Sequence, residues 1–171
     1  MHIILSMKIM RDLFEKQLQA VYNSEVLILS GLPGMLGYAV DESLRDIIKT
    51  QIKATFDQKV RLEQIGKYLP VKYIKNDGMI IRGLLDEINE LYAEFPKGIL
   101  MDVGIISKIQ HVQHFQISAY ETAMLYAKKL DLDEVEAILE QTLDEVYEAD
   151  EECSSYAKNL LLNTKGGKLN L

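Results

Sequence analysis

Apolar and polar positions along the chain follow the period of an α-helix almost throughout. Apolar side chains recur three and four residues apart over five stretches, and none of these shows the two-residue alternation of a β-strand. The pattern predicts helices over about residues 9–29, 42–69, 79–95, 99–130 and 131–162. Four long helices with one short helix between the second and third of them predict an all-α helical bundle.

Short breaks separate the predicted helices. The stretch "GLPGMLG" contains Pro33 and is expected to kink or end the first helix. Asp41 is predicted to cap the second helix, whose inward face would carry Leu44, Ile47, Ile48, Gln51, Thr55, Gln58, Leu62 and Ile65. "VKYIKNDG" is predicted to be a turn. We expect a single domain over 1–171 with its core at about 8–162, and fraying of residues 1–6 and 163–171.

Polar residues interrupt the inward faces near the middles of the long helices. In "IQHVQHFQISAY", Gln113 and Gln116 occupy the stripe that runs from Ile109 to Tyr120. The other inward polar positions are Gln17 and Glu25 on the first helix, Gln51, Thr55 and Gln58 on the second, and Asp150 on the last. An antiparallel bundle would bring them to one level. Because unpaired buried amides and carboxylates are costly, the pattern predicts a shared polar site or its remnant.

Composition narrows the function classes. The net charge of −7, with Lys and Arg scattered, argues against a nucleic-acid partner. No apolar run is long enough to span a membrane, and the single cysteine, Cys153, excludes an intramolecular disulfide and favours a cytoplasmic protein. The acidic run "LDEVYEADEE" is interpreted as solvated surface. Catalytic triads, G-x-S-x-G and Gly-rich phosphate loops are missing from the sequence, which favours a protein that is not an enzyme without deciding the question.

Five ordered stretches carry a resemblance to a known family. They are "DLFEKQLQAVYNSE", "QIKATFDQKVRLEQI", "EFPKG", "QHVQHFQISAYETA" and "AILEQTLDEVYEADEE", and with their flanks they cover the chain from Lys8 to Ala157. In these the chain resembles the YciE/YciF-type ferritin-like stress proteins. The resemblance implies a ferritin-like four-helix bundle with a di-metal carboxylate centre, and a homodimer.

The departures from the family pattern fall on the inward positions. Relatives carry Glu where this chain has Gln17, Ala54, Gln113, Gln116 and Val146, and His where it has Gln51. The positions kept are Glu25, Gln58, His114 and Asp150. Since a di-iron centre needs several carboxylates, the resemblance predicts a degenerate site that holds no di-iron pair. The residues of this tentative remnant metal site are Glu25, Gln58, Gln113, Gln116, His114 and Asp150.

Three readings of the polar positions stay open. The leading one is a neutral hydrogen-bonded network, in which Gln113 and Gln116 meet Gln51, Gln58 and Tyr120, inside a stress-associated protein that is structural or non-catalytic. The alternative is an oxidoreductase-like or metal-storage protein with one iron, manganese or zinc ion on Glu25, Asp150 and nearby amides. The third is a small-molecule pocket lined by the glutamines.

Three further side chains have a predicted place. If Glu25 and Asp150 met without a cation, they would titrate as a coupled pair with at least one raised pKa. His111 and His114 lie off the inward stripe, which favours a non-ligand role for both. Cys153 is predicted to be a small buried side chain.

Overall fold

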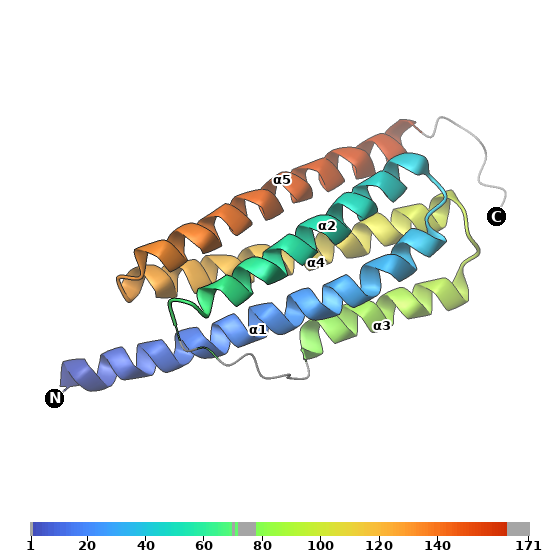
Figure 1. Ribbon diagram of the computed structural model, residues 1–171. Coiled ribbons are helices and arrows are strands. Elements are labelled where there is room, and N and C mark those ends of the chain that lie inside the picture. Colours follow the sequence, from blue (N-terminus) through green and yellow to red (C-terminus); the bar gives the residue numbers. More distant parts are fainter. Residues whose placement is uncertain (1, 70, 72–77, 164–171) are drawn as a thin grey trace.

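The computed structural model describes residues 2–69, 71 and 78–163, and over these residues it is built from helices alone. They are α1 (His2–Tyr38), α2 (Glu42–Ile65), α3 (Met79–Glu94), α4 (Ile99–Lys129) and α5 (Asp133–Asn163). In Figure 1 the four long helices lie side by side, and the short α3 runs along α1. α4 packs against α5 and α1, while α3 rests on α4 and α1. The predicted all-α bundle, with its short helix before the third long one, is confirmed.

α1 is longer than predicted at both ends. It begins at residue 2 and continues through Pro33 to residue 38, so the expected end near residue 29 was wrong. Leu32 and Met35 flank the proline and are both buried in the core, and this packing favours continuation of the helix past Pro33 despite the missing backbone donor. A Cβ atom at Gly31 would lie 2.3 Å from Cδ2 of Leu85 on α3. The glycine therefore makes room for α3, and this stretch is a packing surface instead of a helix end.

The predicted start and inward face of α2 are confirmed, whereas the helix ends at Ile65, about four residues before the predicted end. Asp41 is its N-cap and accepts a hydrogen bond from the backbone N–H of Leu44 at 3.0 Å. All eight residues expected on its inward face are buried. The helices α3, α4 and α5 lie close to their predicted ranges. The predicted turn "VKYIKNDG" lies outside the described residues except for Val71 and Gly78, as does the predicted tail from residue 164 onward.

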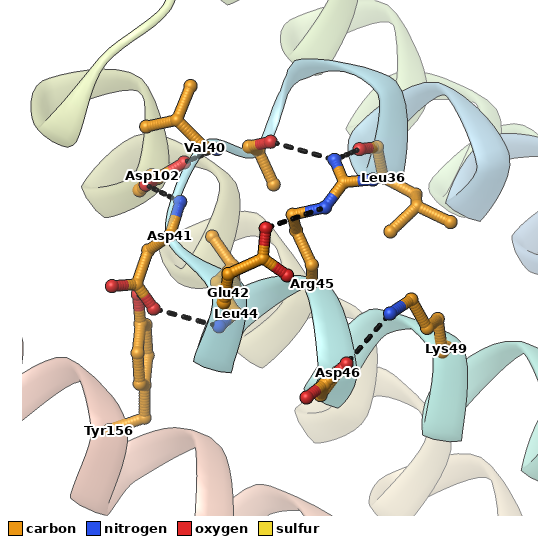
Figure 2. Close-up of polar contacts among 11 residues, drawn as sticks. Leu36, Val40, Asp41, Glu42, Leu44, Arg45, Asp46, Lys49, Asp102 and Tyr156 are labelled. Carbon is orange, nitrogen blue, oxygen red and sulfur yellow. Dashed lines mark hydrogen bonds and ion pairs between the residues drawn. The ribbon is translucent and has the colours of Figure 1, made fainter.

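The loop between α1 and α2 is tied to both other long helices (Figure 2). Asp102, fully buried in the first turn of α4, accepts hydrogen bonds from the backbone N–H groups of Val40 and Asp41, both at 2.9 Å. The hydroxyl of Tyr156 on α5 donates to Asp41 at 3.1 Å. Arg45 donates to two backbone carbonyls near the end of α1, at 2.8 and 3.0 Å. These contacts set the antiparallel register in which residues of different helices share one level.

The apolar core consists of two clusters. One contains buried residues within 28–35 of α1, 44–48 of α2, 81–88 of α3 and 101–112 of α4, together with Ala39 of the α1–α2 loop and Cys153 of α5. The other contains buried residues within 14–21, 62–69, 119–127 and 135–143. On each long helix the predicted polar positions from Glu25 onward fall between these two sets, at one level of the bundle. No helix in the described part of the chain is long and apolar enough to cross a bilayer.

Candidate functional site

A fully buried carboxylate, Glu25, lies at the centre of the polar positions. Nε2 of Gln116 lies 3.0 Å from both of its oxygens, and the hydroxyl of Tyr120 donates to Oε1 at 2.9 Å. Nε2 of Gln116 also lies 3.4 Å from Oε1 of Gln58. We call Glu25, Gln58, Gln116 and Tyr120 the polar layer. It joins α1, α2 and α4, and the hydrogen-bond donors to its central acid in the described structure, Gln116 and Tyr120, are both neutral.

The environment of Glu25 changes its acidity. Burial raises the pKa of the carboxyl to about 7, although the hydrogen bonds from Gln116 and Tyr120 act in the opposite direction. Burial disfavours the charged form because the interior solvates a charge less well than water does. The pKa of Glu25 is therefore raised, but the cause is burial and not the neighbouring carboxylate of Asp150 that was expected.

Gln113 lies outside the polar layer. Its Nε2 donates to Sγ of Cys153 at 3.3 Å, whereas its Oε1 is buried and has no hydrogen-bond partner among the described residues. The predicted burial of Cys153 is confirmed, and burial raises the pKa of its thiol to about 11. The thiol therefore stays protonated at neutral pH and is a poor nucleophile or metal ligand. The expected network splits into two parts, one at Glu25 and one at Cys153.

Asp150 lies at the seam between α5 and α4. Its side chain is 20% exposed, and Oδ1 lies 3.2 Å from Nε2 of His114, whose side chain is 68% exposed. No hydrogen bond or ion pair joins Asp150 to Glu25 in the described structure. The structure thus brings together Glu25, Gln58 and Gln116 of the predicted remnant site, and separately Asp150 and His114.

The remaining departures from the family pattern have mostly apolar or backbone contacts. Nε2 of Gln17 donates to the backbone carbonyl of Ala119 at 2.9 Å, and Val146 is buried. Gln51 and Gln113 line one small, largely apolar cavity of about 10 Å³. Ala54 faces a groove between α2 and α5. None of these side chains supplies a charge to the polar layer.

The donor set of the polar layer does not fit a di-metal centre. It holds one carboxylate, whereas a di-metal centre needs several. Both oxygens of that carboxylate also face the amide nitrogen of Gln116, a hydrogen-bond donor, and not an open position for a metal ion. Among the described residues, no group of three His, Cys, Asp or Glu side chains is close enough to share one ion.

Two polar contacts were missed by sequence reasoning. Arg61 of α2 forms a two-point ion pair with Glu145 of α5, with both N–O distances at 2.6 Å, and also donates to Thr142 at 3.2 Å. The other is the buried Asp102 at the end of the bundle. An acid in the first turn of a helix is a known signal, but it predicts a helix start and not a bond to another loop. The ion pair joins positions far apart in sequence, so no local pattern marks it.

Comparison with known proteins finds relatives that match most of the chain. A family model described as a domain of unknown function (DUF892) matches residues 9–164. The chain is 26% identical over 158 residues to Protein YciF of Escherichia coli (strain K12), which covers 91% of this chain and 94% of that protein.

Solved structures agree with this comparison. The crystal structure of the E. coli stress protein YciF matches with a TM-score of 0.86 at 24% identity, covering 91% of this chain and 98% of that one. YcfI of Rhodopseudomonas palustris, for which a structural role has been suggested, matches with a TM-score of 0.82 at 28% identity, covering 85% and 93%. The likeness to the YciF structure, at this identity, shows the fold.

Proposed function

The chain belongs to the family described as a domain of unknown function (DUF892), and we propose that it is a ferritin-like, stress-associated bundle protein with a structural, non-catalytic role. The similarity to YciF, a stress protein, and to a protein with a suggested structural role supports this proposal. A cytoplasmic setting is part of it, supported by the single cysteine. The observation that carries the proposal is the buried Glu25, whose partners are all neutral.

The polar layer is suited to holding the carboxyl group of Glu25 without a metal ion. A di-metal centre places several carboxylates around two cations, so that the charges offset one another. Here the amide of Gln116 and the hydroxyl of Tyr120 are donors, and donors stabilise the acceptor oxygens of Glu25. Burial favours the neutral form of Glu25, whose pKa is raised to about 7. A layer of this kind fixes the register of the helices without a cation.

Metal content after reconstitution tests this proposal. We expect protein incubated aerobically with ferrous iron, then desalted with a chelator, to retain no di-iron pair, because the layer offers one carboxylate. Elemental analysis per chain and the absorption of an oxo-bridged iron pair are the measurements. Two irons per chain, lost in Glu25→Gln, would contradict the proposal. One tightly held ion, lost in the same variant, would favour the single-metal alternative.

A homodimer is a second part of the proposal. The apolar stripe of α3 mostly covers its own bundle, because Ile81 and Ile88 are buried. Large apolar side chains remain exposed elsewhere, among them Met79 and Ile80 at the start of α3 and Phe56 on α2. We expect light scattering at tens of micromolar, roughly where standard-size interfaces hold, to give twice the chain mass. A monomer over that range would count against the dimer.

A further inference from the structure

A polar groove runs between α2 and α5 on the surface of the bundle. It has a volume of about 410 Å³, and Thr50, Gln51, Ala54, Glu148, Ala149 and Glu152 are among its lining residues. Two of these are alanines, one on each helix, so the helices are separated at this level by small side chains. A second hollow of about 430 Å³ shares Thr50 and Glu152 with the first, so the two form one trough along the seam. We call it the α2–α5 groove.

Four acidic side chains (Asp57, Glu145, Glu148 and Glu152) and two basic ones (Lys53 and Arg61) line this groove, and two of the acids have no counter-ion. Glu145 pairs with Arg61 at 2.6 Å, and Asp57 pairs with Lys53 at 3.2 Å. Glu148 and Glu152 of α5 are exposed to solvent and form no ion pair or hydrogen bond with any other described residue. They lie one helical turn apart, roughly 6 Å along the axis. Two carboxylates at this spacing on one wall attract a cation with spread charge.

Gln51 gives independent evidence for a ligand. It lines the groove and also the small apolar cavity inside the bundle, is only 8% exposed, and forms no hydrogen bond with another described residue. A glutamine amide offers two N–H donors and a carbonyl acceptor, and buried amides are nearly always paired. A ligand in the groove that donated a hydrogen bond to Oε1 of Gln51 would supply the missing partner.

We propose that the α2–α5 groove binds a linear aliphatic di- or polyammonium ion. One ammonium group donates to Gln51 at the floor, and others pair with Glu148 and Glu152 on the wall. A compact metal ion fits less well, because no three His, Cys, Asp or Glu side chains of the described residues could share one. An alkyl chain of three or four methylene groups separates two ammonium groups by about one helical turn, as the carboxylates are separated. Its methylenes would lie against Ala54 and Ala149.

Calorimetric titration with spermidine at low salt tests the site. We expect one saturable site per chain, weakened about ten-fold in the double variant Glu148→Gln/Glu152→Gln. The matched control is Glu134→Gln/Glu140→Gln, which removes the same charge from exposed positions of the same helix outside the groove. The control should change the affinity less than about two-fold, since distant surface charges are screened. Gln51→Met, of similar shape, should weaken binding several-fold.

Four results would overturn this proposal. They are an absence of saturable binding, equal weakening in both double variants, unchanged affinity in Gln51→Met, and magnesium chloride binding with the same stoichiometry and the same sensitivity to the substitutions. Equal weakening would identify general attraction to an acidic protein. The iron experiment does not bear on this site, because Glu25 is not part of the groove.

Discussion

Replacement of Glu25 by glutamine is expected to remove a large part of the pH dependence of stability. The carboxyl is fully buried, and its pKa is raised to about 7 from an ordinary value of 4.5. The substitution keeps a carbonyl acceptor for Tyr120 at nearly the same place and cannot ionise. We therefore expect the free energy of unfolding of wild type to fall, relative to that of Glu25→Gln, by about 2 to 3 kcal/mol between about pH 5 and pH 8.

The sign follows from proton uptake. Between the unfolded and folded pKa values of Glu25, the folded chain holds a proton that the unfolded chain has released. The stabilisation from this proton is complete below the unfolded pKa, and it is lost as the pH rises through the folded pKa. Above about pH 7 the folded chain carries a buried charge, which the donors Gln116 and Tyr120 only partly compensate.

Urea unfolding at several pH values measures this effect. The matched control is Glu140→Gln, an exposed glutamate on α5, whose stability should follow that of wild type across the range. Other titrating groups affect all three proteins alike, so the difference between variants isolates Glu25. An identical pH dependence in wild type and Glu25→Gln would show that the carboxyl is ionised throughout, as a bound cation would cause.

Sequence reasoning predicted helices best where packing and local signals agree. The inward face of α2 was predicted completely, because its apolar period and the Asp41 cap both indicate the same helix. The prediction that the first helix ends before Pro33 was wrong, because tertiary contacts override this local signal for a helix end. Leu32 and Met35, which lie on either side of the proline, are buried in the core, and α3 packs against α1 at Gly31. That contact joins segments far apart in the chain, so a local pattern cannot show it.

The sequence predicted which polar side chains share one level of the bundle better than it predicted which of them form hydrogen bonds with one another. Helical period placed Gln116 and Glu25 inward, and the structure brings their side chains to 3.0 Å. Gln113 lies one turn earlier, and its amide reaches Cys153 instead. The period gives a direction to within a fraction of a turn, whereas the choice of partner depends on rotamers and on the rotation of the facing helix. Asp150 shows the same limit of the helical period. It was expected to face the core, and a small rotation of α5 is enough to place its side chain at the seam with α4 instead.

Restoring the family's carboxylates at four positions is expected to have the largest effect on stability. The variant combines Gln113→Glu, Gln116→Glu, Ala54→Glu and Val146→Glu, and of these four positions Gln116 contacts Glu25 in the described structure. The substitution at 116 alone replaces an amide that lies 3.0 Å from both oxygens of Glu25 by a second carboxylate. Like charges at this distance in a buried site repel or take up protons. We expect a loss of about 3 to 5 kcal/mol at pH 8 without metal, and a smaller loss in acid.

Thermal unfolding with and without ferrous or manganous ions distinguishes a neutralised metal site from an ordinary polar core. Ions that bind only the folded chain should raise the Tm of the fourfold variant and leave wild type unchanged. The control carries the same added charge at exposed positions, through Gln64→Glu, Gln141→Glu, Ala93→Glu and Ala137→Glu, and should neither lose much stability nor gain Tm with metal. If the fourfold variant fails to fold, Gln116→Glu alone carries the test, since it still adds a carboxylate beside Glu25. Equal stabilisation of wild type by metal would mean that the native amides are ligands, and the proposed non-catalytic, metal-free layer would be wrong.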